Sequence, residues 1–165
     1  MQESPEQPRG PLQRAGFDHL LDVGMKEDLS SAFLTAHADE GTVWFLSDDG
    51  GSLVARYNSG PDSERIVGFQ QPLGRGLISM VFETEQAFCE NDVQRNSVQD
   101  KRLDQRLGKA TQALIAVPFG FRGEICGVIS CVRLSSGNGF TGRDLDLVTR
   151  AAERFQETIE RSLAP

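Results

Sequence analysis

Residues 112–134 read QALIAVPFGFRGEICGVISCVRL, with two apolar runs on either side of Gly120-Phe121-Arg122-Gly123. The runs, at 112–118 and 124–134, are short and rich in branched side chains, which is typical of strands. The segment between them begins and ends with glycine and has the composition of a turn. The whole stretch therefore predicts a β-hairpin.

A second hairpin is predicted upstream. Residues 42–47 (TVWFLS) and 52–57 (SLVARY) are short runs rich in branched and aromatic side chains. Asp48-Asp49-Gly50-Gly51 between them is a strong turn signal. A third, weaker strand is expected at about 65–70 and a brief one at 87–89. The two hairpins and these shorter strands indicate a mainly antiparallel sheet.

Amphipathic helices are predicted at both ends of the chain. In the first, at about 17–36, large apolar residues recur every four positions, although Gly24 lowers helix stability by ~1 kcal/mol. A shorter helix is expected at 77–84, and residues 93–108 are expected to be polar and irregular. The final helix is predicted to start at a capping box, Thr141 with Asp144. Its apolar positions are Leu145, Val148, Ala152, Phe155, Ile159 and Leu163.

This final stripe is close to a heptad pattern. We expect one side of it to pack on the sheet and its seam to face a second copy of the chain. The order of elements predicts an α+β fold. Residues 1–11 contain three prolines and few apolar side chains, so they are predicted to be a disordered leader. Residues 12–165 are predicted to form one domain, with its core at about 38–134 and the C-terminal helix at 141–163.

The composition narrows the classes of partner. The chain has 165 residues and a formal net charge of −7. Nucleic acid is not an expected partner, because binding it needs clustered positive charge. No stretch is long and apolar enough to cross a membrane, and the N-terminus lacks the apolar core of a signal peptide. We therefore expect a cytoplasmic protein without a membrane partner.

Five short motifs follow one another in an order typical of one family. They are Gly41–Gly50 (GTVWFLSDDG), Pro72–Leu77 (PLGRGL), Asn91-Asp92-Val93, Val117-Pro118 with Arg122–Glu124 and Cys126–Ile129, and Phe140-Thr141 before Asp144-Leu145. Together they resemble the GAF domains, a family of small-molecule sensing and regulatory domains. The resemblance implies an α+β fold with a central, mostly antiparallel sheet of five to six strands. It also implies terminal helices on one face of the sheet, and pocket helices and loops on the other.

The resemblance places a small-molecule pocket beneath residues 74–107. The candidate ligand-binding residues are Gly74, Arg75, Gly76, Cys89, Asp92 and Arg95. Backbone N–H groups between the two glycines, at a predicted helix start, suit an anion; the alternative is a tight turn into the helix. Residues 90–109 carry five basic and four acidic side chains. This local excess favours an acidic small molecule, and the alternative is a solvated, salt-bridged surface helix.

The remaining candidates also have two interpretations. Asp92 is suited to bind a ligand, but Asn91 and Asp92 serve equally well as helix caps. Cys89 is the one cysteine whose position in the sequence allows it to reach the pocket. The alternative, for all three cysteines, is that the side chain is buried and packs as a small apolar group. Cys126 and Cys131 lie five positions apart on one strand, which predicts opposite faces of the sheet. Three cysteines without framework spacing predict reduced thiols.

Haem, a metal ion and a covalent bilin are not expected as cofactors, and the ligand itself is left open. Both histidines, His19 and His37, lie in the predicted N-terminal helix, and no cluster of imidazoles or thiolates is expected in the pocket. Bilin-binding GAF domains carry a cysteine in the pocket segment, whereas residues 93–109 contain none.

Taken together, the sequence predicts a regulatory domain in signal transduction and not an enzyme. A ligand beneath residues 74–107 would bias how the terminal helices pack in a homodimer, and so control an effector domain on another chain. One alternative is a ligand-free dimerisation module whose pocket is filled by its own side chains. The other is a thiol-dependent reductase of the methionine sulfoxide type, with Cys89 as the candidate nucleophile.

Overall fold

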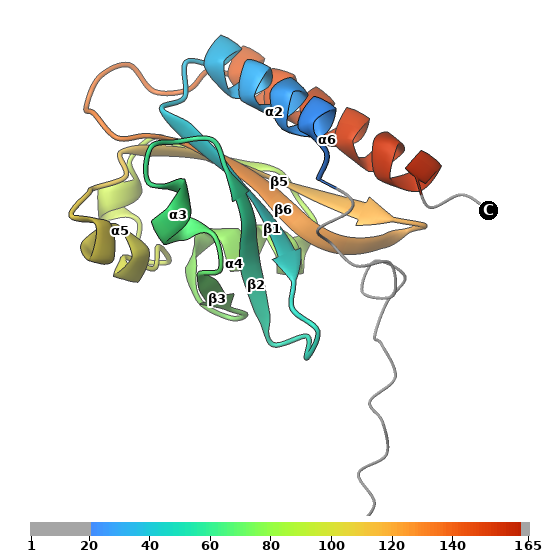
Figure 1. The fold of residues 1–165 in the computed structure, drawn as a ribbon. Helices are drawn as coiled ribbons and strands as arrows, with labels where there is room; N and C mark the ends of the chain where they lie inside the picture. Colours follow the sequence, from blue (N-terminus) through green and yellow to red (C-terminus); the bar gives the residue numbers. More distant parts are fainter. Residues whose placement is uncertain (1–20, 163–165) are drawn as a thin grey trace, which may run out of the picture.

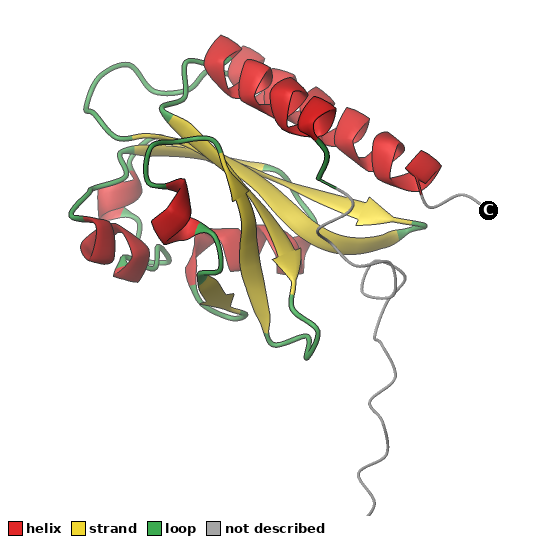
Figure 2. Cartoon of the chain, viewed as in Figure 1, coloured by secondary structure: helices red, strands yellow, loops and turns green. Residues whose placement is uncertain are grey.

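The two predicted hairpins form the centre of a six-stranded sheet with helices on both faces (Figures 1 and 2). The computed structural model describes residues 21–162, so the predicted leader 1–11 and the start of the first predicted helix lie outside the described residues. The helices are α2 (Val23–Thr35), α3 (Ser63–Ile66), α4 (Gly76–Thr84), α5 (Arg102–Leu107) and α6 (Gly142–Ser162). The strands are β1 (Glu40–Leu46), β2 (Ser52–Asn58), β3 (Gln70–Pro72), β4 (Phe88–Glu90), β5 (Ala113–Phe121) and β6 (Glu124–Arg133).

The sheet has the strand order β3-β2-β1-β6-β5-β4, and every neighbouring pair is antiparallel. Strand β6 lies at the centre and pairs with β1 from Glu40↔Val132 to Phe45↔Gly127. On its other edge it pairs with β5 along the whole hairpin. The predicted α+β class and the mainly antiparallel sheet are therefore confirmed.

A β-bulge interrupts the β5–β6 hairpin at Cys126. Phe119 pairs with Gly127 and Gly120 pairs with Ile125, which leaves Cys126 as the extra residue. The bulge shifts the alternation of side chains, so Cys126 packs against the same core as Cys131. The prediction that these two cysteines face opposite sides of the sheet is wrong for this reason.

The sheet separates two hydrophobic cores. On one face α2 and α6 lie side by side (Figure 1) and enclose the helix-side core, which includes Phe45, Phe119 and Phe155. The rings of Phe119 and Phe155 meet edge to face with centroids 5.0 Å apart. On the other face α3, α4 and α5 cover the pocket-side core, which includes Trp44 and Leu114.

Helix α6 starts at the predicted capping box. Thr141 Oγ1 accepts a hydrogen bond from the Asp144 amide at 3.2 Å, and the Asp144 carboxylate accepts one from the Thr141 amide at 2.8 Å. The apolar stripe of α6 is used within the chain, because Val148, Phe155 and Ile159 are at most 3% exposed. Within the described residues the stripe is therefore taken up by packing inside the chain, while Leu163 lies outside them.

Two predictions for the middle of the chain need correction. The predicted strand at 65–70 is wrong, since α3 occupies its beginning and β3 starts only at its end. The helical turn places Ile66, which is 1% exposed, in the pocket-side core, and Gly68, at φ +94°, turns the chain towards β3. The segment 93–108, expected to be irregular, contains a short 3-10 turn and α5.

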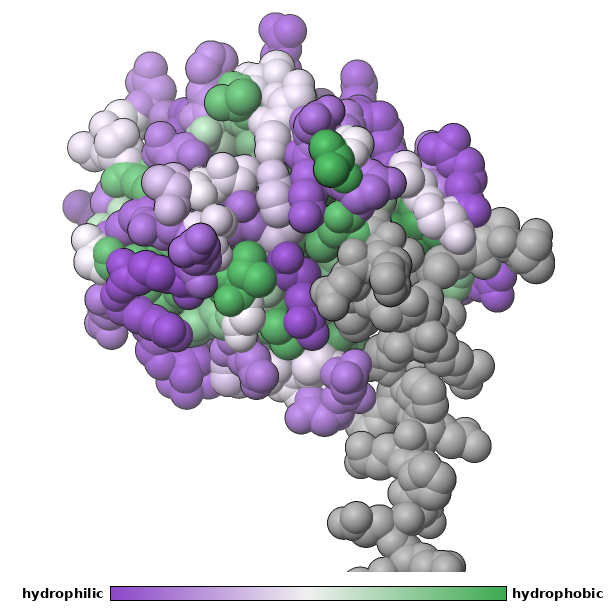
Figure 3. Space-filling view, viewed as in Figure 1, coloured by the Kyte–Doolittle hydropathy of each residue, from purple (hydrophilic) through white to green (hydrophobic). Residues whose placement is uncertain are grey.

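The surface is mainly polar. The side of the molecule seen in Figure 3 carries mostly hydrophilic residues, with hydrophobic ones in small separate patches. Among the described residues, the exposed large hydrophobic ones are Val23, Leu34, Val67 and Val98. Between residues 21 and 162, no helix combines the length and the apolar character that crossing a membrane needs.

Gly127 provides a direct test of the packing at the sheet centre. A Cβ at this position would collide with the Trp44 carbonyl oxygen and the Phe119 ring. Gly127→Ala should therefore lower the free energy of unfolding by about 2–3 kcal/mol, as overpacking does. Gly137→Ala, where a Cβ would meet nothing within 4 Å, should change it by less than about 1 kcal/mol. Urea denaturation of both variants measures the difference, and equal effects would refute this packing.

Candidate functional site

A cavity of about 70 Å³ lies between the sheet and the helices α4 and α5. Its wall combines apolar side chains of the pocket-side core with polar side chains from several distant segments. The polar wall residues are Glu40, Thr42, Gln71, Gln99, Asp100, Asp104, Thr111 and Ser130. We call this space the inner cavity.

Strand β1 supplies one wall of the inner cavity. Because side chains alternate along a strand, Glu40, Thr42 and Trp44 share the face that looks towards α4 and α5. The Trp44 indole N–H donates to Ser130 Oγ on β6 at 3.0 Å. The side-chain amide of Asn58 donates through Nδ2 to Thr42 Oγ1 at 2.9 Å. These buried polar groups are therefore paired and hold the wall in a defined arrangement.

Asp100 closes the cavity next to the start of α4. Gln71 Nε2 donates both to the Arg75 carbonyl oxygen at 2.8 Å and to the Asp100 carboxylate at 3.0 Å. Arg102 donates to the same carboxylate through its guanidinium and its backbone N–H. The hydrogen bonds from Arg102, and then that from Gln71, hold the pKa of Asp100 well below its usual range. We call this group the Asp100 cluster.

Glu40 is another carboxylate of the cavity wall and lies beside Lys109. Its Oε2 is buried without a hydrogen bond, and the nearest ammonium, Lys109 Nζ, is 3.8 Å away. Lys109 makes its closer contact with Asp62. Burial raises the pKa of Glu40, while the hydrogen bond from Lys109 lowers the pKa of Asp62.

Asp104 is the third carboxylate of the cavity wall. Its two oxygens accept hydrogen bonds from the Thr111 amide at 2.7 Å and from Thr111 Oγ1 at 3.0 Å. These bonds tie α5 to the start of β5. Within residues 21–162, no three His, Cys, Asp or Glu side chains form a group that could hold a metal ion.

An outer hollow of about 590 Å³ lies on the surface beside the inner cavity. Three of its wall residues, Gly76, Gln99 and Asp100, also line the inner cavity. The other wall residues are Gly74, Arg75, Ser97, Val98, Lys101, Arg102 and Gln105. The Asp100 cluster therefore stands between a basic outer hollow and the inner cavity.

The comparison with protein families identifies the family of the chain. A family model described as GAF domain matches residues 27–160, most of the chain. The chain belongs to the GAF domain family. The resemblance seen in five sequence motifs is thereby confirmed. No curated protein gives a significant match to this GAF domain.

Solved structures share the fold at low sequence identity. The GAF domain of a phosphoenolpyruvate-protein phosphotransferase from Coxiella burnetii is 18% identical, with a TM-score of 0.67, and the match covers 84% of this chain and 94% of that one. The GAF domain of a two-component sensor histidine kinase from Bacillus halodurans is 12% identical, with a TM-score of 0.68 and coverages of 87% and 96%. A type II free methionine-R-sulfoxide reductase from Thermoplasma acidophilum is 19% identical, with a TM-score of 0.59 and coverages of 83% and 95%.

The structure separates the six candidate residues of this GAF domain into two groups. Gly74, Arg75 and Gly76 all line the outer hollow, and Gly76 also lines the inner cavity. Gly74 N–H donates to Ser79 Oγ at 2.7 Å, so part of the predicted anion-binding loop is already hydrogen-bonded within the chain. Asp100 lies directly against Gly76, where an external anion was expected.

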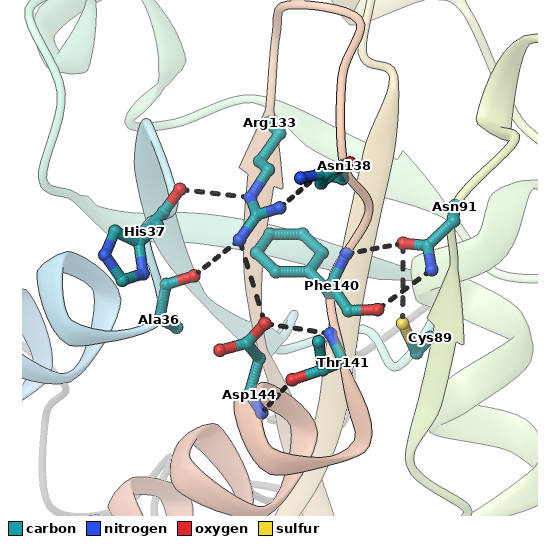
Figure 4. A network of polar contacts seen from close by, with 9 residues as sticks. All are labelled: Ala36, His37, Cys89, Asn91, Arg133, Asn138, Phe140, Thr141 and Asp144. Carbon is teal, nitrogen blue, oxygen red and sulfur yellow. Dashed lines mark hydrogen bonds and ion pairs between the residues drawn. The ribbon is translucent and has the colours of Figure 1, made fainter.

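Cys89, Asp92 and Arg95 line neither space. Asp92 makes no capping hydrogen bond and forms an exposed pair with Arg95 at 3.7 Å. Asn91 does not cap a helix either. Its side chain exchanges two hydrogen bonds with the backbone of Phe140 (Figure 4).

Cys89 belongs to a separate polar network near the start of α6. Its thiol is 3.9 Å from Asn91 Oδ1, and Arg133 ties the same region to the end of α2 (Figure 4). Arg133 also stacks over Phe140, with 4.3 Å to the ring centroid. Burial raises the pKa of the Cys89 thiol and raises those of Cys126 and Cys131 to about 12. The described cysteines therefore favour the thiol over the reactive thiolate.

Sequence reasoning missed the polar residues that line the inner cavity. The available signal was in β1 and β6, where Glu40, Thr42 and Ser130 interrupt otherwise apolar runs on the face that carries Trp44. Gln71, Asp100 and Asp104 had no comparable signal, because their burial depends on how the loops fold back over the sheet.

The Asp100 cluster predicts a pH-dependent difference in stability. Asp100→Asn should lower the free energy of unfolding at neutral pH by about 1–3 kcal/mol, the range for hydrogen bonds to a charged group. Because folding lowers the pKa of Asp100, its contribution is present above the unfolded value near 3.8 and is lost as the pH falls below it. The difference between wild type and variant should shrink accordingly in urea titrations at decreasing pH.

Asp92→Asn is the matched control on the same segment. Asp92 and Arg95 are exposed, so this change should alter the free energy of unfolding by less than about 0.5 kcal/mol. Equal losses in the two variants, or a pH-independent loss for Asp100→Asn, would argue against the cluster.

Proposed function

We propose that this GAF domain is a cytoplasmic regulatory module that senses a small molecule bound in the inner cavity. The observation that carries the proposal is the wall of that cavity, in which buried polar side chains surround space that the chain leaves unfilled. Ligand sites have this character, with a mainly apolar wall and a few placed polar groups. The shared fold with GAF domains of a sensor histidine kinase and a phosphotransferase supports a role in signalling.

The size of the cavity determines which ligands fit without a change in the protein structure. About 70 Å³ accommodates a compact group, whereas drug-sized ligands occupy pockets of roughly 300–1,000 Å³. A larger ligand would have to displace residues 97–111, which cover the cavity. These residues are held by Leu103 and Leu107, which are partly buried against the pocket-side core, and by polar contacts. The polar contacts include the Asp100 cluster and the bond from Arg65 Nη2 to the Arg106 carbonyl oxygen at 2.7 Å. Displacing this segment would also join the inner cavity to the outer hollow.

The sheet provides a route from the ligand to the terminal helices. Residues of β1 and β6 face the cavity on one side of the sheet and the helix-side core on the other. A ligand that shifts these strands would therefore alter the surface on which α2 and α6 pack. It does so only to the extent that it binds the two packings with different affinity. In our proposal this change acts on a homodimer and on an effector domain carried by another chain.

A homodimer through the terminal helices would use their outer surface, because the stripe of α6 is buried. That surface carries two exposed hydrophobic residues of α2, Val23 at 71% and Leu34 at 73%. The rest of the contact would be polar, which is typical of regulated rather than obligate interfaces.

A second candidate function is a dimerisation module without a ligand. The observation that favours it is the small volume of the inner cavity, about 70 Å³, whose wall includes the apolar side chains of Leu103, Leu107 and Trp44. The reductase alternative has less support. Cys89 lies outside the cavity, and burial raises the pKa of its thiol.

A thermal-shift screen of nucleotides, small acids and small amines tests the sensing role. A ligand at a hundred times its Kd stabilises the folded state by ~2.7 kcal/mol. For a domain of this size, this should raise the melting temperature by about 5–10 °C. The measurement is the melting curve of the full chain with each compound.

A matched pair of variants locates the site. Leu107→Phe places a ring at the edge of the inner cavity and should abolish the shift. Val67→Phe also introduces a ring, at an exposed position that lines neither the inner cavity nor the outer hollow, and should leave the shift intact. If no compound shifts the melting temperature, or if the shift survives Leu107→Phe, the dimerisation module becomes the better account.

A further inference from the structure

The wall of the inner cavity is acidic, although the segment that covers it is rich in basic residues. The charged wall residues are Glu40, Asp100 and Asp104, and no lysine, arginine or histidine in residues 21–162 lines the cavity. Lys101 and Arg102 line the outer hollow instead. The local excess of positive charge therefore faces away from the inner cavity, and the acidic ligand expected from the sequence would suit only the outer hollow.

Glu40 is a wall residue with a buried side-chain oxygen that lacks a hydrogen bond. It is 7% exposed, and its buried Oε2 accepts no hydrogen bond. Lys109 Nζ, at 3.8 Å, makes its shorter contact with Asp62. A buried carboxylate oxygen without a hydrogen bond is costly, so an N–H group of a ligand at this place would be stabilised.

Trp44 is a second feature of the cavity that suits a cation. Its indole is 4% exposed, lines the cavity and lies on the same face of β1 as Glu40. The bond from its N–H to Ser130 Oγ fixes the ring in place. Indole is the aromatic group that attracts cations most strongly, and the attraction grows when water is excluded.

We propose that the inner cavity takes a small organic cation with N–H donors, of the amine or amidine class, and that Glu40 is its main acceptor. The proposal rests on the proposed function, because it names the ligand class of that cavity. An acid in the same space would meet the Asp104 carboxylate and the ion-paired carboxylates of Asp100 and Glu40, while the cations of these pairs do not line the cavity. Repulsion between like charges is stronger in a medium of low dielectric constant than in water. The volume of about 70 Å³ restricts the undisturbed site to a compact group.

Acetamidinium, acetamide and acetate are matched probes for this proposal. They share one planar shape and differ in charge, from positive through neutral to negative. Trp44 is the only tryptophan of the chain, so its indole N–H resonance and its fluorescence report on the cavity directly. Each probe is titrated into the full chain at neutral pH, with sodium chloride added to keep the ionic strength constant.

Acetamidinium should shift the Trp44 resonance along a saturating curve, and acetamide should bind at least about tenfold more weakly. Acetate should produce no saturating change. Binding of acetate as tight as that of acetamidinium would overturn the proposal while leaving the cavity as a ligand site. A lack of any saturating response to acetamidinium would also overturn it, and the screen with Leu107→Phe then decides the sensing role separately.

Two variants with the same change in net charge test the role of Glu40. Glu40→Gln keeps the shape of the side chain and should weaken acetamidinium binding by about tenfold or more. Glu153→Gln, on the exposed side of α6, should leave the affinity unchanged within about twofold. Equal weakening in both variants would show a general charge effect and overturn the assignment of Glu40. If Glu40→Gln fails to fold, Asp104→Asn is the second cavity variant. It should weaken acetamidinium binding by a smaller factor.

Discussion

Strand β6 is hydrogen-bonded along both edges, to β1 and to β5, and the rest of the structure is arranged around this ladder. Both faces of the ladder are covered, so its side chains alternate between two cores and not between a core and water. The close approach at Gly127, where the Trp44 carbonyl and the Phe119 ring occupy the place of a side chain, brings β1 and β5 tightly against β6. This constraint fixes which side chains meet on each face.

The two faces of the sheet differ in the interactions that hold the covering segments in place. On the helix side, large apolar rings such as Phe45 and Phe155 bind α6 to the sheet. On the pocket side, α4 packs with buried apolar residues, whereas α5 contains no fully buried residue and contributes only the partly buried Leu103 and Leu107. Residues 97–111 are otherwise held by hydrogen bonds and ion pairs around Asp100, Asp104 and Lys109. Segments with few buried apolar contacts open at low free energy. The cover of the cavity is therefore the part of the fold best suited to move.

The sequence predicted the features that depend on local pattern. The two hairpins follow from short apolar runs around glycine-rich turns, and the capping box of α6 follows from Thr141 and Asp144 alone. The bulge at Cys126 was missed because nothing in the strand pattern distinguishes it from regular alternation. Residues 65–66 were misassigned because a single helical turn buries Ile66 as well as a strand would.

The site could be predicted only in outline. A pocket beneath residues 74–107 was expected from family motifs, but its wall comes from segments as far apart as Glu40, Asp100 and Ser130. The local count of basic residues led to the prediction of an acidic ligand, and a count does not record the direction of side chains. Arg102 and Lys101 line the outer hollow, while the carboxylates line the cavity.

The central claim is that the inner cavity is a ligand site whose cover, residues 97–111, opens separately from the rest of the domain. Amide hydrogen exchange of the ligand-free protein tests this most directly. The account predicts that the amides of α5 exchange through a local opening, with a free energy well below that of global unfolding, while those of β6 exchange only through global unfolding. If the amides of α5 and β6 exchange with the same free energy, the cover does not open on its own and the claim is contradicted.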